Sequence, residues 1–401
     1  MSWVSGLIVA LVCSRLTVGP SVQDKPPTLR IYGFAQADAI ADFKQNKPSA
    51  FDITRPSTLP SAPKQFGEDG NFYLTARQSR FGVQGTLPTS NGDVTAVFEF
   101  DMFGVGTDAG QTTIRLRHAY GQWKQLGAGQ TNSQFMDGDV FPDILYYWSP
   151  NGMLLLRNPQ VFWQPYAKGK SNLTLAIEKP GAAGDAGTYA DHVELSNVAL
   201  RFPMPDVTGH YRLGGDWGYV QAGGVLRYIG YDDSTPNDPF DLSGHVWGWG
   251  VSISSNLKAS DHDTLRLQTV FGAGIGNYLN DAPIDVAAKA NPGVPTRPVV
   301  GEAIPVFTVV AYVDHKWSDT WSTSAGYSSV NESNSDGQAP AAFKAGQYAS
   351  ANLLCRPASN FVAGPEFQWA RRENKSDGFS VNDYRVLFSL KYSFDHRLGG
   401  S

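Results

Sequence analysis

Apolar and polar residues alternate almost strictly near the end of the chain, over residues 384–394. Every second residue there is aromatic or aliphatic, namely Tyr384, Val386, Phe388, Leu390, Tyr392 and Phe394. Because side chains of a strand point alternately to its two faces, this pattern predicts a strand with one apolar face. Aromatic residues at both ends with aliphatic residues between them favour a lipid-facing strand over a strand of a soluble sandwich.

The same alternation recurs along the chain, and charged residues repeatedly fall on one face. It is clearest in residues 96–102, 114–120, 173–178, 265–271 and 366–369. Short turns are predicted at 89–93, 168–171, 214–217, 317–319 and 357–360, and long polar loops at 44–70, 133–152, 180–204, 276–304 and 331–344. This spacing predicts an all-β fold, a transmembrane antiparallel β-barrel of about 16 strands with short periplasmic turns and long extracellular loops.

Composition and charge agree with this fold class. The 401 residues include 42 Gly, 17 Tyr, 22 Phe and 10 Trp but only 2 Cys, which favours many strands joined by tight turns. A net charge of -5 argues against nucleic acid as a partner, because nucleic acid is a polyanion. Outer-membrane lipid is the expected surrounding.

The longest apolar run, residues 7–13, is too short to cross a bilayer but has the length of a secretory signal core. We therefore expect a signal peptide at 1–22, the barrel at 23–394 and a C-terminal tail at 395–401. Cys355 would be the one cysteine of the mature chain, which excludes an intramolecular disulfide.

Motifs of catalysis are missing from the sequence. It holds no Gly-x-Ser-x-Gly elbow, His-Glu-x-x-His pair, phosphate-binding loop or Cys-x-x-Cys pair. We therefore expect no enzymatic activity, no cofactor and no metal site.

Charged residues on the predicted strands mostly oppose the apolar face. Those expected to line the pore are Arg80, Arg115, Arg117, Arg157, Arg227, Arg266, Lys391, Glu99 and Asp101. An arginine facing lipid at mid-strand would cost about 2–4 kcal/mol, so these side chains should face a wet lumen. Arg77 and Arg80 cannot both face inward without a bulge, and Phe81 and Val83 mark Arg80 as the inward one.

The loop at about 133–152 combines acidic and aromatic residues that could narrow the pore. Its candidate constriction residues are Asp137, Asp139, Asp143, Tyr147 and Trp148. A basic wall facing an acidic loop would create a transverse field and favour passage of small anions. Alternatively, the arginines neutralise the acids and hold the loop inside the barrel, and the two roles are compatible.

Several segments resemble the DcaP-like family of trimeric outer-membrane porins of Gram-negative bacteria. They are residues 78–82, 98–101, 112–121, 129–131, 135–137, 139–142, 147–148, 152–153 and 157–160. The resemblance implies a homotrimer of sixteen-stranded barrels, a third loop folded into the pore, and preference for negatively charged solutes such as dicarboxylates. Three features depart from it: Asn132 replaces an expected aromatic, the chain continues past Phe394, and no helix is predicted before the first strand.

Two other functions fit the same sequence. A receptor or adhesion barrel with a closed lumen would act through its long loops, and a secreted β-protein such as a lectin would need no membrane. Solute flux separates the first from a porin, and solubility without detergent identifies the second.

Overall fold

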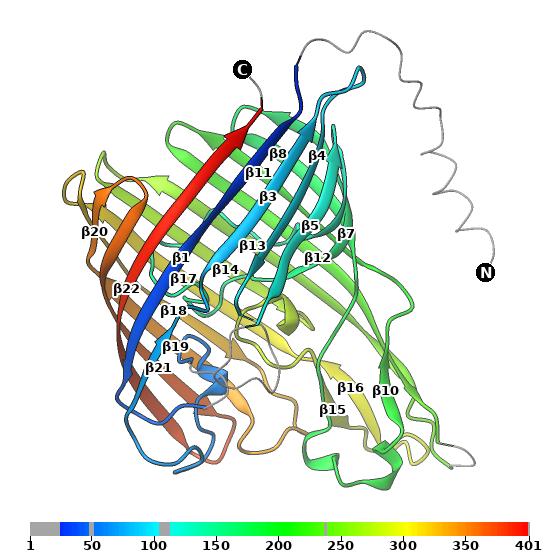
Figure 1. The fold of residues 1–401 in the computed structure, drawn as a ribbon. Coiled ribbons are helices and arrows are strands. Elements are labelled where there is room, and N and C mark those ends of the chain that lie inside the picture. The colour runs from blue at the N-terminus through cyan, green and yellow to red at the C-terminus, as the bar shows by residue number, and fades with distance from the viewer. Residues whose placement is uncertain (1–24, 48–51, 104–112, 236–238, 400–401) are drawn as a thin grey trace.

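A computed structural model describes residues 25–47, 52–103, 113–235 and 239–399, which form a closed antiparallel β-barrel (Figure 1). The strands are β1 (Thr28–Asp42), β2 (Asn71–Thr75), β3 (Arg80–Leu87), β4 (Val94–Asp101), β5 (Arg115–Trp123), β6 (Leu126–Asn132), β7 (Arg157–Lys168), β8 (Ser171–Glu178), β9 (Gly184–Asp185), β10 (Val198–Arg201), β11 (Asp206–Gly215), β12 (Gly218–Asp233), β13 (Gly244–Lys258), β14 (Asp263–Ala273), β15 (Val286–Ala290), β16 (Val299–Ala303), β17 (Pro305–Lys316), β18 (Trp321–Glu332), β19 (Phe343–Asn352), β20 (Leu354–Ala358), β21 (Phe361–Asn374) and β22 (Ser380–Leu398). The described residues also form four short 3-10 helices: η1 (Pro56–Thr58), η2 (Gly187–Tyr189), η3 (Val193–Leu195) and η4 (Gly276–Tyr278). Of the helices among the described residues, none is long and apolar enough to span a membrane.

The predicted strand number is confirmed. The main sheet has 19 strands, and three positions in its wall are each shared by two consecutive strands: β2 with β3, β10 with β11, and β19 with β20. Nineteen less three gives 16 wall positions. Pairing of β1 with β22, from Leu29↔Leu398 to Asp42↔Arg385, closes the barrel.

Short turns and long connections lie at opposite ends of the barrel, with the first described residues and the C-terminus at the turn end (Figure 1). All five predicted turns coincide with turns of the structure to within two residues. In the first of them, Gly92 has a φ of +106°, a conformation that favours glycine. The turn end is periplasmic and the long loops are extracellular.

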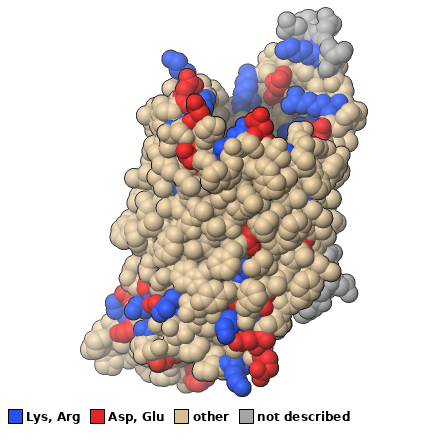
Figure 2. Space-filling view, turned by 90° about the vertical axis from the view of Figure 1, so that its left-hand side faces the viewer, with Lys and Arg blue, Asp and Glu red and all other residues tan. Residues whose placement is uncertain are grey.

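The outward face of the wall is apolar, as the alternation predicts. On β22, the six aromatic or aliphatic residues of the pattern point outward, while Asp383, Arg385 and Ser389 are buried on the inner side. On the face shown in Figure 2, most charged residues lie near the two ends, and the band between them is largely uncharged. This is the surface that outer-membrane lipid requires.

The last strand runs further than expected. We predicted a tail from residue 395, but β22 continues to Leu398 and pairs with the start of β1. Arg30 and Asp395 form an ion pair in this extension. The predicted signal peptide, 1–22, lies outside the described residues.

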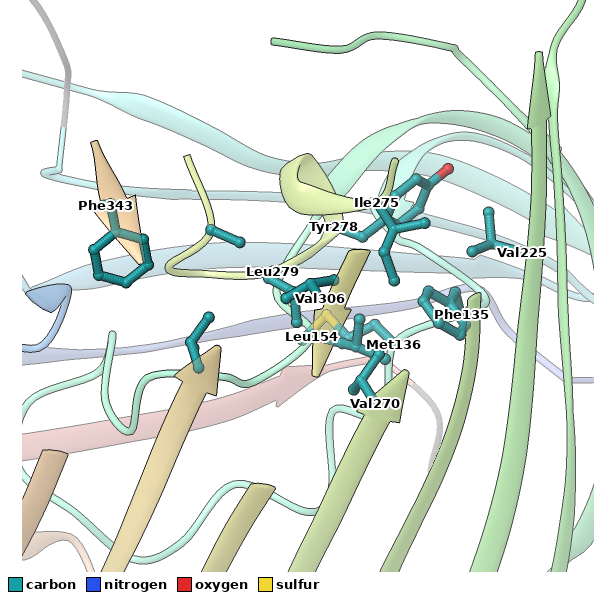
Figure 3. Packing of buried hydrophobic residues seen from close by; sticks show 12 residues of the cluster. Phe135, Met136, Leu154, Val225, Val270, Ile275, Tyr278, Leu279, Val306 and Phe343 are labelled. Atoms are coloured by element: carbon teal, nitrogen blue, oxygen red, sulfur yellow. The ribbon is translucent and has the colours of Figure 1, made fainter. Parts of the chain in front are cut away.

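Described parts of three long loops fold into the barrel and pack against its inner wall: L1 (43–47 and 52–70), L3 (133–156) and the first part of L6 (274–304). Figure 3 shows Phe135, Met136 and Leu154 of L3 in contact with apolar residues of L6 and of the wall. Two smaller apolar clusters join L3 and L1 to strands of the wall: one contains Leu145 and Tyr146 of L3, and the other contains Ile53 and Leu59 of L1. The apolar core of the molecule therefore lies inside the barrel, and the predicted entry of the third loop is confirmed.

Candidate functional site

Acidic residues of L3 hold it to the wall. Asp137 accepts hydrogen bonds from Arg212 at 2.8 Å, Tyr219 at 2.8 Å and Ser254 at 2.6 Å. Asp139 also pairs with Arg212, and Asp143 pairs with Arg356. These carboxylates bind arginines of β11 and β20, so the predicted field between them and the basic wall of β3 to β7 is not the observed arrangement.

The predicted basic residues on β3 and β5 do meet around the two acids of β4. Arg117 donates to Glu99 at 2.6 Å and to Asp101 at 3.0 Å. Arg115 binds Asp101 through two hydrogen bonds, of 3.0 and 2.6 Å, and Arg80 lies 3.5 Å from Glu99. The result is one connected charged network inside the lumen.

Two irregularities of the backbone enlarge this network. The register of β4 and β5 shifts between Glu99 and Phe100, so that Glu99 pairs with His118 and Phe100 with Leu116. A bulge of this kind places an extra residue on one strand, and Arg117 and His118 both contact Glu99. The wall is also interrupted between β2 and β3, and there Arg77 packs its guanidinium 4.8 Å from the ring of Phe103. Arg77 and Arg80 thus both lie inside.

Tyr147 of L3 lies at the centre of the basic cluster. Its hydroxyl accepts a hydrogen bond of 2.8 Å from Arg157. The guanidinium groups of Arg117, Arg80, Arg115 and Arg157 lie 4.8, 5.6, 5.9 and 5.9 Å from its ring centre. Trp148 lies between Arg115 and Arg55, at 5.3 and 4.2 Å. Both predicted aromatics therefore contact cations.

Burial raises the pKa of Tyr147, but the positive charges of Arg157, Arg117 and Arg115 outweigh burial and bring its pKa down to about 8. The residue sits on L3, outside the membrane-spanning strands. Its hydroxyl is therefore a group that changes charge near neutral pH inside the basic cluster.

Two lumen cations lack an acidic partner. Arg157 forms no ion pair with any described residue and contacts Tyr147 instead. Lys391, in the part of the chain that the structure describes, likewise forms none, and its ammonium group lies 4.0 Å from the ring centre of Phe34. Arg80 contacts the same ring at 5.2 Å. Asn132, which stands where the family resemblance predicts an aromatic residue, pairs with Arg157 across β6 and β7.

Two other predicted pore arginines lie outside the cluster around Tyr147. Arg227 is 1% exposed and does not line a passage, because L4 (179–197) and L6 cover it. Arg266 pairs with Asp314 at 2.7 Å and lines a cavity at the turn end with Asp143 and Arg356, so that its place along the pore stays a prediction.

Sequence reasoning missed Arg212 and Arg356 and rejected Arg77 in favour of Arg80. Arg212 was detectable, since it alternates with the outward Tyr211 and Leu213, but nothing local marks Arg356. Within the described ranges, no three His, Cys, Asp or Glu side chains are grouped as a metal site would need.

Comparisons with known proteins agree with this architecture. The model of the DcaP outer membrane protein family matches residues 15–393. Similar solved structures include the outer membrane channel DcaP of Acinetobacter baumannii, with 20% identity, a TM-score of 0.75, and coverage of 93% of this chain and 99% of that chain. The anion-selective porin from Comamonas acidovorans has 9% identity, a TM-score of 0.57, and coverage of 92% and 100%.

The trimer form of OmpT of Vibrio cholerae has 12% identity, a TM-score of 0.56, and coverage of 92% and 100%. At such identities these likenesses show the fold alone. No curated protein matches the sequence.

Proposed function

The chain belongs to the DcaP outer membrane protein family, and from this premise we propose that it lets small anions, of the dicarboxylate type, diffuse through its lumen. The family consists of channels of the Gram-negative outer membrane and not of enzymes. Selectivity for anions is the part of the proposal that rests on this chain's own residues.

The observation that carries it is the excess of positive charge around Tyr147. Arg80, Arg115, Arg117 and Arg157 supply four cations, and Glu99 and Asp101 supply two anions, which leaves an excess of two. Lys391 lies next to this cluster, because it and Arg80 contact the same Phe34 ring. Arg157 and Lys391 form no ion pair with a described residue, so a solute can bind them without displacing an acidic side chain. A carboxylate entering the cluster would therefore find positive charge that the protein has not neutralised.

The interaction energies favour passage of a solute through the lumen over its retention there. A carboxylate 4 Å from an arginine gains about 4 kcal/mol at an effective dielectric of 20. Loss of hydration by both ions offsets most of this gain. Weak binding at several neighbouring sites is what conduction requires, because a solute has to leave as readily as it enters.

We also propose that the protein is a homotrimer. The OmpT structure with a similar fold is described as a trimer form. The outward face of β1 offers a flat contact surface, because only Gly33, Ala35, Ala37, Ala39 and Ala41 follow Ile31 on it. Small side chains let a neighbouring barrel approach closely.

A second function has one observation in its favour. L1, L3 and L6 fill much of the lumen with apolar contacts, as a receptor or adhesion barrel with a closed lumen would. Solute flux decides between the two, since a closed barrel passes none.

Planar-bilayer recording tests the proposed function. In a potassium chloride gradient we expect discrete conductance steps and a reversal potential that shows chloride to be the more permeant ion. Absence of steps, together with no swelling of liposomes in small sugars, would favour the closed barrel. Steps with a preference for potassium would reject anion selectivity and leave only a general pore.

Anion selectivity should fall as pH rises through about 8. Below that pH, Tyr147 is neutral, and above it the tyrosinate adds a fixed negative charge among the arginines, since its pKa is about 8. Reversal potentials at pH 6.5 and 9.5 measure the change. Tyr147→Phe is the control, because it retains Arg80, Arg115, Arg117, Arg157, Lys391, His118, Glu99 and Asp101 but cannot ionise. An equal pH effect in this variant would assign the change to another group.

A further inference from the structure

A cavity of about 300 Å³ lies among the extracellular loops, apart from the basic cluster. One of its sides is a small three-stranded sheet, in which β15 pairs with β16 and with β9. The other side is formed by β10 and the end of β12, which extend the barrel wall. Figure 1 shows β10, β15 and β16 together at the loop end.

The lining of this cavity is apolar. Of its 15 residues, only Asp185 and Tyr231 have polar side chains. The Asp185 carboxylate already accepts hydrogen bonds from the Gly187 amide at 2.8 Å and from Gln338 at 3.0 Å. The Tyr231 hydroxyl accepts one from the Gly301 amide at 3.0 Å.

Small residues keep the cavity open. Ala288 and Gly301 are partners across β15 and β16 and present the same face. A Cβ on Gly301 would lie 2.6 Å from the ring of Tyr231, which belongs to the cavity lining. The face of β15 and β16 that carries Ala288 and Gly301 is therefore turned toward the cavity. A Cβ on Gly184 would lie 3.6 Å from Leu200, at ordinary contact distance. Larger side chains at such positions would fill the space, whereas the sequence leaves it free.

The cavity stands beyond the lipid-facing band. Arg201 and Asp232 form an ion pair on the opposite face of β10 and β12, with side chains 50% and 47% exposed. Charges so exposed indicate that this part of the wall lies in water and not in hydrocarbon. A ligand would therefore enter from the aqueous side.

We propose that this cavity binds a small neutral apolar molecule, such as a single hydrocarbon ring or a short alkyl chain, taken from solution. Its volume is within the range of ligand pockets, and each of its two polar side chains already accepts a hydrogen bond from the protein. A charged solute or a sugar would lose hydration without finding new partners there. The site is thus chemically distinct from the anion path and independent of the proposed function.

Bromobenzene is a suitable probe, because its bromine can be located by anomalous diffraction in soaked crystals of the full chain. We expect a bromine peak among Leu200, Leu242 and Val286 in the wild type. Ala288→Leu should remove the peak by filling the space. Ala290→Leu should retain it, because Ala290 lies on the same strand but outside the lining.

Heat-modifiability on gels checks that each variant forms a folded barrel, and the diffraction map checks the loops. No bromine peak in the wild type, with the loops placed as here, would overturn the proposal. A lipid acyl chain found in the cavity would also overturn it, since the ligand would then come from the membrane. Retention of the peak in Ala288→Leu would place the binding elsewhere.

Discussion

Replacing Arg227 by methionine is expected to release L4 and L6 from the barrel wall. The Arg227 side chain is fully buried and binds Asp206 at 2.9 Å, Asp285 at 2.8 Å and Asn277 at 2.7 Å. It also donates to backbone carbonyls of Gly181 in L4 and Gly274 in L6. Removal of one partner from a buried ionic network costs about 3–5 kcal/mol, because the remaining charges stay uncompensated. Chymotrypsin should then cut the two loops, and single-channel conductance should increase.

Arg201→Met is the matched control. Arg201 lies nearby on β10 and pairs with Asp232, but both side chains are about half exposed. Water solvates an exposed partner after the pair is broken, so resistance to chymotrypsin should be retained. If Arg227→Met kept both wild-type resistance and wild-type conductance, the network would not be what fixes these loops.

The barrel could be predicted because its signals are local. Alternation of apolar and polar residues is a property of each strand alone, and the band of lipid makes it regular on every strand. The turns were predictable for the same reason, as Asn91-Gly92 shows. The end of β22 was misplaced because the residues after Phe394, namely Asp395 to Leu398, interrupt the apolar alternation although they still pair with β1.

The interior of the barrel was harder to predict because its contacts are long-range. Arg115 and Arg117 were both expected inside the barrel, and both bind Asp101 there. Arg227 was assigned to the pore because nothing in β12 shows that L6 covers it. Arg356 contacts Asp143, 213 residues earlier, and such a pair leaves no local trace. Arg77 was rejected as an inward-facing residue because the sequence alone does not reveal the break between β2 and β3. Such a break becomes visible only when the neighbouring strands are placed.

Substituting Arg115 and Arg117 together by glutamine should remove most of the preference for chloride. The excess of positive charge around Tyr147 falls from two to zero, because two cations are removed while Glu99 and Asp101, their main partners, remain. Each charge is worth about 1 kcal/mol to an ion at 4 Å in bulk water, so removal of both weakens the attraction for chloride by about 2 kcal/mol, and the ratio of chloride to potassium permeability should fall by about thirtyfold or more. Reversal potentials in a salt gradient provide the measurement, and the effect should weaken at high ionic strength.

Arg115→Lys with Arg117→Lys separates charge from geometry. Lysine retains both charges but cannot form the paired hydrogen bonds of arginine to Asp101. If charge controls selectivity, this variant should keep the preference for chloride that the glutamine variant loses. Equal loss in both variants would mean that the guanidinium network shapes the passage. An unchanged permeability ratio in the glutamine variant would place the selective step away from Tyr147 altogether.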